Sequence, residues 1–156
     1  MTDATQSRFF YFDVSHAIRV HDWIIENSGG LDGVIDIGQL ESPLEHIKND
    51  LYYPEIQCKL THLVFSINKN HAFSDGNKRS SLALGAYFLE LNGYDFTVKR
   101  FIMAMENIAV WVADNVIDKE LLYQIITSLI YEEGYSESLQ LEIYDATLVA
   151  SANRQG

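Results

Sequence analysis

The amino-acid sequence predicts an all-α fold on three grounds. The two prolines, Pro43 and Pro54, both lie early in the chain, which leaves the rest free to form uninterrupted helices. Apolar residues recur at helical spacing in several segments between residues 13 and 133. Glycine follows two of these segments where a helix would end, at Ser28-Gly29-Gly30 and at Asn92-Gly93.

Helices are expected at residues 13–27, 55–68, 78–91, 99–115 and 118–133. Asp13 or Ser15 can cap the first of them, and Asp118 the last. Residues 78–91 carry apolar side chains on nearly every face, so we expect this helix to be central and buried. The tail from Tyr135 fits a helix or a short strand, and residues 152–156 are expected to fray.

The segment between the first two of these helices is uneven. Asp32-Gly33 and Gly38 indicate turns, and residues 34–37 alternate like a short extended piece. A short helix is expected to start near Leu40, with Pro43 in its first turn. We expect residues 33–44 to form a surface loop or flap outside the core.

Composition and charge narrow the function classes. A chain of 156 residues with 47% hydrophobic residues fits one globular domain, residues 1–156, and a formal charge of −11 disfavours nucleic acid and anionic membranes as partners. No apolar run reaches the roughly 20 residues that span a membrane. The N-terminal residues lack the apolar core of a signal peptide, and a single cysteine, Cys58, fits a reducing compartment. A cytoplasmic location is therefore expected.

A polar segment, HAFSDGNKRSS at residues 71–81, separates two apolar runs. Its second half would open the helix at 78–91, and a helix N-terminus offers unpaired N–H groups to an anion. Gly76 allows these groups to converge, Asn77 adds a neutral donor, and Lys78 and Arg79 add positive charge. This pattern predicts an anion site, although each residue alone also fits an ordinary turn or helix start.

The other polar residues of the segment suggest the chemistry. The carboxylate of Asp75 would repel a phosphate unless Mg²⁺ lies between them. His71 can take a proton from an attacking hydroxyl near neutral pH. Phe73 is interpreted as the anchor of the loop, and His21 is expected to pack behind it. Together the residues favour phosphoryl or nucleotidyl transfer.

Residues 71–79, HAFSDGNKR, resemble the HxFx[DE]GNxR motif of the Fic/Doc superfamily, and residues 14–96 resemble its Doc branch. The resemblance implies a Fic-fold helical bundle with a small flap or β-hairpin, completed by C-terminal helices at 97–150. It also implies that His71 is the general base, that Asp75 binds Mg²⁺, and that Gly76, Asn77 and Arg79 hold the phosphates of ATP.

Two positions separate the branches of this superfamily. Fic AMP-transferases usually have glycine where this chain has Lys78 and a second arginine where it has Leu82, whereas Doc-type toxins have lysine at the first position. Gly76 differs from the alanine common in Doc proteins. The resemblance favours a Doc-like kinase that phosphorylates a Ser/Thr hydroxyl of a translation factor such as elongation factor Tu. AMP transfer to a protein hydroxyl and a catalytically inactive nucleotide-binding module are the alternatives.

Partners and regulation are suggested by the same resemblance. Residues 33–44 are similar to the segment that docks the target protein. The chain has no match to the inhibitory pattern [ST]xxxE[GN] of Fic proteins, since the nearest segment, residues 127–134, is out of register. Inhibition by a second protein, a Phd-like antitoxin, would fit the absence of this pattern. His62 and Cys58, four residues apart on one expected helix, are too few ligands for a metal site.

Overall fold

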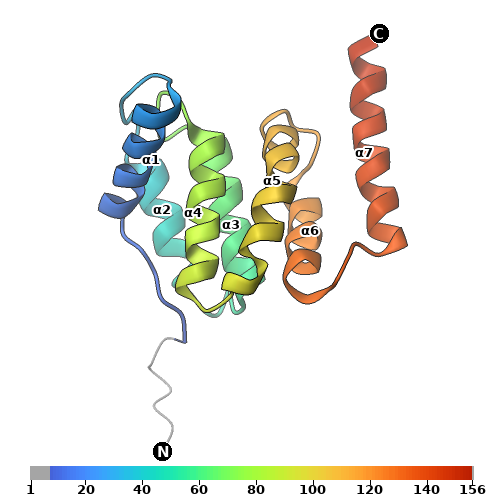
Figure 1. Ribbon diagram of the computed structural model, residues 1–156, viewed down its shortest axis with the longest axis horizontal. Helices are drawn as coiled ribbons and strands as arrows, with labels where there is room; N and C mark the ends of the chain where they lie inside the picture. Colours follow the sequence, from blue (N-terminus) through green and yellow to red (C-terminus); the bar gives the residue numbers. More distant parts are fainter. Residues whose placement is uncertain (1–7, 156) are drawn as a thin grey trace, which may run out of the picture.

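The computed structural model describes residues 8–155, so the expectations for residues 1–7 and Gly156 lie outside it. Within this range the chain forms a helical bundle (Figure 1), which confirms the all-α prediction. The helices are α1 (Val14–Ser28), α2 (Gly38–His46), α3 (Ile56–Lys69), α4 (Asn77–Leu91), the short 3₁₀ helix η1 (Asp95–Thr97), α5 (Val98–Ala113), α6 (Lys119–Tyr131) and α7 (Glu137–Gln155).

Helix α1 begins and ends where its sequence signals predict. The side chain of Asp13 accepts a hydrogen bond of 2.8 Å from the backbone N–H of His16, which caps the first turn. At the other end Gly29 has a φ of 87° and its N–H bonds to the carbonyl of Ile25, so the helix stops there.

The most central helix is α3, not α4 as expected. Helix α3 packs against α2, α4, α5 and α6, while α4 packs against α1, α3 and α5. The sequence of α3 looked only amphipathic because it contains polar residues, yet Gln57, Lys59 and Asn68 are buried. Each donates to an internal acceptor, for example the amide nitrogen of Asn68 to the carbonyl of Ala109, although the side-chain oxygen of Asn68 is buried without a hydrogen-bond partner.

Lys59 is the largest of these buried side chains. Its ammonium donates to the carbonyl of Ile47 at 2.5 Å and to the carboxylate of Asp50 at 2.6 Å. It also lies 4.7 Å from the ring centre of Phe9. These contacts connect the segment after α2 and the N-terminal segment around Phe9 to the centre of the bundle.

The expectation that residues 33–44 lie outside the core is wrong for their second half. Helix α2 starts at Gly38 and buries Leu40, Pro43 and Leu44, so Pro43 lies in the helix interior and not in its first turn. Residues 31–39 are exposed, and they form a flap without a β-hairpin among the described residues. A single isolated β-bridge, between Val34 and Phe73, takes the place of the hairpin.

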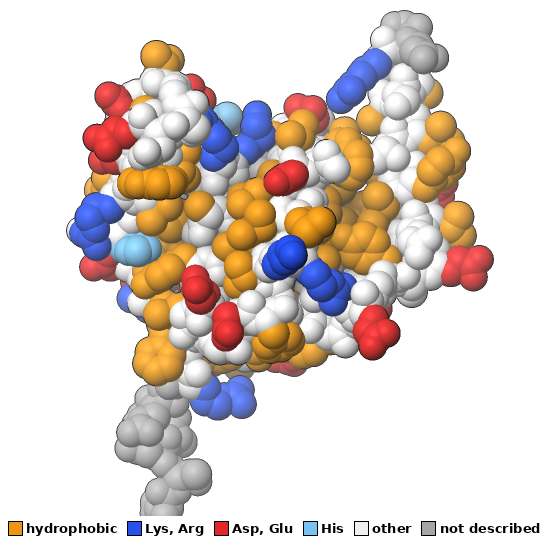
Figure 2. Space-filling model, viewed as in Figure 1, with side chains coloured by type: hydrophobic (Ala, Val, Ile, Leu, Met, Phe, Trp, Pro, Cys, Tyr) orange, Lys and Arg blue, Asp and Glu red, His pale blue; other side chains and the backbone are white. Residues whose placement is uncertain are grey.

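The C-terminal part contains three helices. The expected helices at 99–115 and 118–133 correspond to α5 and α6, and the tail is a helix, α7, which continues through Arg154 where fraying was expected. Figure 1 shows α7 at the edge of the molecule, beside α5 and α6. A groove of about 440 Å³ between α5 and α7 is lined by apolar residues such as Met103, Trp111 and Tyr144 (Figure 2).

In the described part of the chain, none of the helices has the length and apolar character needed to cross a membrane.

Candidate active site

Residues 71–76 of the polar segment form the loop between α3 and α4, and residues 77–81 form the start of α4. Phe73 is completely buried, as its interpretation as an anchor predicted. The side-chain amide of Asn77 donates to the carbonyl of Phe73 at 2.9 Å and accepts from its N–H at 3.2 Å. The two hydrogen bonds between Asn77 and the backbone of Phe73 therefore hold Phe73 and the start of α4 together. The side-chain oxygen and one side-chain N–H of Asn77 are used in this way.

Gly76 is the N-cap residue of α4 and adopts the left-handed conformation, with φ 79° and ψ 16°. This conformation favours glycine over any residue with a Cβ atom. The first intrahelical bond of α4 runs from the N–H of Ser80 to the carbonyl of Gly76 at 2.9 Å. The N–H groups of residues 77–79 have no helical acceptor at this helix start, which makes the end of α4 suited to an anion.

Asp75 lies at the same helix start, and its carboxylate binds two backbone N–H groups. Gly76 donates to one oxygen at 2.8 Å and Leu31 to the other at 3.2 Å. These two hydrogen bonds, and then the charges of Arg79 and Lys78, lower the pKa of Asp75 below its usual range. The carboxylate is ionised at neutral pH and half exposed, so it could serve as an oxygen ligand for a hard cation such as Mg²⁺.

Arg79 is held against the end of α1. Its Nη1 donates to the hydroxyl of Ser28 at 2.7 Å and to the carbonyl of Gly29 at 2.8 Å, and its Nη2 lies 3.8 Å from the carboxylate of Asp75. The guanidinium therefore has a fixed position beside the start of α4. Figure 2 shows lysine and arginine side chains together with a histidine at this upper end of the molecule.

His71 and Lys78 are the exposed members of the site. His71 has a positive φ of 51°, which is unusual for a residue other than glycine. Neither imidazole nor ammonium makes a hydrogen bond or ion pair with any residue between 8 and 155. Both groups are therefore available to a ligand. An observed backbone outlier of this kind supports a functional hypothesis for His71.

The flap is joined to the loop through backbone hydrogen bonds. The N–H of Ile35 donates to the carbonyl of Ala72 at 2.8 Å, and the N–H of Ser74 donates to the carbonyl of Gly33 at 3.0 Å. The flap thus lies directly beside the exposed side of the loop.

Sequence reasoning missed the contribution of the turn after α1. The triplet Ser28-Gly29-Gly30 was interpreted only as a helix stop, yet Ser28 and Gly29 hold Arg79 and Leu31 binds Asp75. Gly30 has a φ of 124°, and a Cβ atom there would lie 2.7 Å from Oδ2 of Asp75. A second glycine in a helix stop is the signal that could have indicated this close approach. The expectation for His21 is confirmed, because it is buried behind the loop and bonds to the backbone of Asp75.

His62 is part of a hydrogen-bonded cluster of side chains. Its Nδ1 accepts from Lys119 at 2.7 Å, and its Nε2 lies 3.0 Å from Nδ1 of His46. Burial, followed by the neighbouring Lys119 and His46, lowers the pKa of His62 to about 4. Within residues 8–155 we find no group of three or more histidine, cysteine, aspartate or glutamate side chains that could hold a metal ion.

The sequence of this chain is similar to those of known proteins. The profile described as the Fic/DOC family matches residues 11–89. A protein of Escherichia phage P1 named protein kinase doc is 35% identical over 80 residues, which cover 49% of this chain and 63% of that protein. The toxin Doc of Mycolicibacterium smegmatis is 35% identical over 89 residues, which cover 52% of this chain and 68% of the relative. The match to the phage protein thus spans less than two thirds of its length.

Proposed function

This chain belongs to the Fic/DOC family, and from this premise we propose that it transfers the γ-phosphoryl group of ATP to a serine or threonine hydroxyl of a target protein. The observation that carries the proposal is the residue pair Lys78 and Leu82. Lys78 places an unpaired positive charge at the start of α4, and Leu82 packs against the core where AMP-transferases of the superfamily have an arginine. The name of the phage relative, protein kinase doc, supports the same reaction.

His71 is the proposed general base. Its neutral imidazole would accept the proton of the target hydroxyl while the hydroxyl oxygen forms a bond to the γ-phosphorus. The bond between that phosphorus and the β–γ bridging oxygen breaks, and ADP leaves with the electron pair. The exposed position of His71 and its lack of a partner among the described residues leave the imidazole accessible to a protein substrate.

Asp75 is the proposed magnesium ligand. Its lowered pKa keeps the carboxylate ionised, and its half-exposed position lets it serve as a hard oxygen ligand, so the residue fits the ion. When bound, Mg²⁺ would neutralise phosphate charge. The N–H groups at the start of α4, the backbone of Gly76 and Asn77, and the side chains of Lys78 and Arg79 would orient the phosphates by their own charges and dipoles.

The proposed docking segment for the target is residues 33–44, of which residues 33–39 belong to the exposed flap. Val34, Ile35 and Ile37 expose 40%, 66% and 46% of their surface beside the loop, which would suit an extended segment of another protein. Elongation factor Tu is the first target to test, because the resemblance to Doc toxins points to a translation factor. Such a target would place the protein in the cytoplasm.

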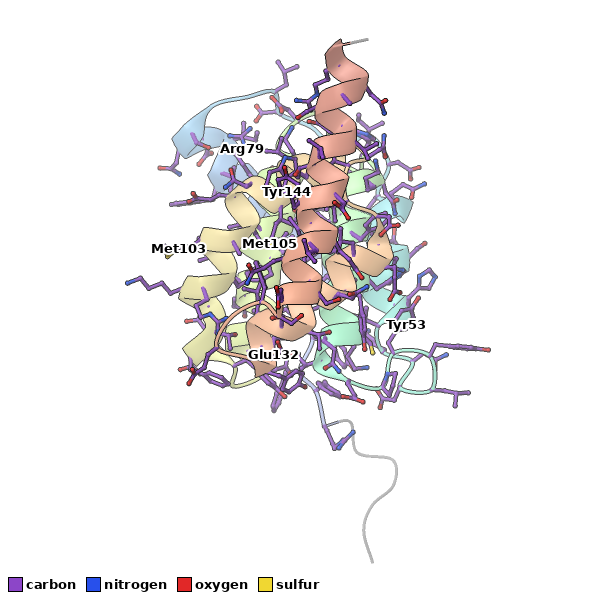
Figure 3. The ribbon with its side chains drawn as sticks, turned by 90° about the vertical axis from the view of Figure 1, so that its right-hand side faces the viewer. Tyr53, Arg79, Met103, Met105, Glu132 and Tyr144 are labelled. Atoms are coloured by element: carbon purple, nitrogen blue, oxygen red, sulfur yellow. The ribbon has the colours of Figure 1, made fainter. Side chains whose placement is uncertain are left out.

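A Phd-like antitoxin is the proposed regulator. The sequence segment closest to the inhibitory Fic pattern lies at the end of α6, where the hydroxyl of Ser128 bonds to Glu132. Figure 3 shows Glu132 and Arg79 at opposite ends of the molecule. This segment is therefore not a brake on the candidate site, and a brake from a second protein would fit.

The decisive experiment is label transfer from ATP. We expect the purified protein to transfer label from γ-labelled but not α-labelled ATP to elongation factor Tu, and His71→Ala to abolish the transfer. His46→Ala is the matched control, since His46 is an exposed histidine outside the loop and should leave transfer unchanged. Transfer of the α-label would favour AMP transfer instead. Binding of Mg-ATP without transfer to any protein substrate would favour an inactive module.

A further inference from the structure

His21 makes two close contacts with the motif loop. The residue lies on α1, is completely buried, and has its Nε2 2.7 Å from the carbonyl oxygen of Asp75. Its ring stacks on Phe73 with the centroids 3.8 Å apart and the planes 5° from parallel. The other ring nitrogen, Nδ1, lies 3.2 Å from the exposed carboxylate of Asp22.

The contact with Asp75 assigns the donor. A carbonyl oxygen only accepts hydrogen bonds, so the proton of this bond is on Nε2 of His21. The bond is short for N–H···O and is shielded from water because His21 is buried. The carbonyl of Asp75 is therefore held towards α1.

The direction of this carbonyl determines the direction of the neighbouring N–H. The carbonyl of Asp75 and the N–H of Gly76 belong to the same planar peptide unit, which is trans, and in a trans unit the two groups point in opposite directions. While His21 holds the carbonyl inward, the N–H of Gly76 points outward to the start of α4. There it already binds an anionic oxygen, Oδ1 of Asp75, at 2.8 Å.

We propose that His21 is a positioning residue for the phosphate-binding loop. Its Nε2–H holds the Asp75–Gly76 peptide in the one orientation that presents the N–H of Gly76 to a phosphate, and stacking on Phe73 holds the ring in place. This inference rests on the proposed function for its ligand, a nucleotide phosphate. The orientation of the peptide itself does not depend on any activity.

Two variants separate the hydrogen bond from the packing. His21→Phe keeps an aromatic ring against Phe73 but loses the donor, whereas His21→Gln loses the ring but keeps an N–H near the position of Nε2. The matched control is His16→Phe, because His16 also lies on α1 and stacks on an aromatic ring, that of Tyr87 at 4.3 Å, away from the loop. The midpoint of thermal unfolding is measured for each variant, so that loss of folding is recognised.

The first measurement concerns the backbone amide of Gly76. Its nitrogen chemical shift and its rate of hydrogen exchange are recorded without nucleotide. The second is the affinity for Mg-ATP by calorimetry. We expect His21→Phe to move the Gly76 signal and to weaken Mg-ATP binding about tenfold, the effect of one hydrogen bond to a charged group. His21→Gln should recover most of the wild-type Gly76 signal and of the wild-type affinity for Mg-ATP. His16→Phe should change neither the signal nor the affinity.

The outcomes distinguish this inference from the proposed function. An unchanged Gly76 amide in His21→Phe overturns the positioning role, and so do equal losses in His21→Phe and His21→Gln, which would assign the effect to packing. If the wild-type chain does not bind Mg-ATP, the proposed function fails while the Gly76 amide still decides the role of His21. If neither variant folds, the imidazole nitrogen spectrum of the wild-type chain decides, since a proton absent from Nε2 contradicts the proposal.

Discussion

Gly30 shows how one residue without a side chain determines the geometry of the candidate site. Its backbone lies against the carboxylate of Asp75 and the guanidinium of Arg79, which leaves no room for a Cβ atom. Gly29, its neighbour, also has a positive φ but has no atom within 4 Å of the corresponding position. The two glycines therefore share the conformational requirement and differ in crowding.

We predict that Gly30→Ala weakens Mg-ATP binding more than Gly29→Ala does. Both variants should lose about 1–2 kcal/mol of stability because alanine disfavours a positive φ. Only the first should displace Asp75 and Arg79, since its Cβ would lie 2.7 Å and 3.0 Å from their side-chain atoms. Calorimetry and thermal unfolding measure the two effects. Equal binding by both variants would show that the close approach has no consequence for the site.

Asp75 also links the site to the pH dependence of stability. Its pKa is lowered in the folded chain by the N–H groups of Leu31 and Gly76, and then by Arg79 and Lys78. A carboxyl group with a lowered folded pKa stabilises the fold above its unfolded pKa of about 3.9, and this contribution is lost as the pH falls through the folded value.

We therefore predict that Asp75→Asn flattens the acid limb of the stability curve. The unfolding midpoint of the wild-type chain should fall more steeply below about pH 4 than that of the variant. The control is Asp32→Asn, an exposed acid of the flap, which should keep the wild-type slope. Parallel curves for wild type and Asp75→Asn would mean that the carboxylate does not hold these N–H groups in solution.

At the scale of the element, α3 shows why helix patterns misjudge burial. Its pattern fits an amphipathic helix, but Gln57, Lys59 and Asn68 are buried with partners supplied by α5, by the segment after α2 and by Tyr131. Helix α2 shows that burial can also be missed when a helix has few apolar residues. Leu40, Pro43 and Leu44 are too few to form a periodic signal, yet all three are buried against the bundle. Burial depends on distant residues that a local pattern does not contain.

Lys59 provides the test at this scale. Lys59→Met keeps a long side chain but removes the shorter of the two hydrogen bonds to the carbonyl of Ile47, whose other donor is the hydroxyl of Tyr11 at 3.4 Å. It also removes the contact with Asp50, so we expect a loss of about 1–3 kcal/mol. Lys48→Met removes an exposed ammonium that pairs with Glu45, and should cost less than about 0.5 kcal/mol. Urea unfolding measures both. Equal losses would contradict the view that the buried ammonium ties the segment after α2 to α3.

For the whole molecule, the sequence was informative where signals are local and contiguous. Asp13 and Gly29 marked both ends of α1, and residues 71–79 marked the loop because the motif lies in one stretch of chain. The turn at Ser28-Gly29-Gly30 could not be assigned to the site from sequence, since it is about 50 residues away from Arg79 along the chain. The place of α7 at the edge of the bundle was also not predictable, because it depends on how α5 and α6 pack.

The carboxylate of Asp75 has a consequence for the protein before any substrate arrives. It binds the N–H groups of Gly76 and Leu31, and in the proposed function the N–H of Gly76 is a donor that a phosphate oxygen would use. The loop is therefore preorganised around a negative charge and would have no need to refold if a nucleotide bound there. An incoming phosphate would compete with this carboxylate and release it from Gly76. Occupation of the site would thus be an exchange of one anion for another, and the displaced carboxylate would become available as a ligand at the moment when the phosphate enters.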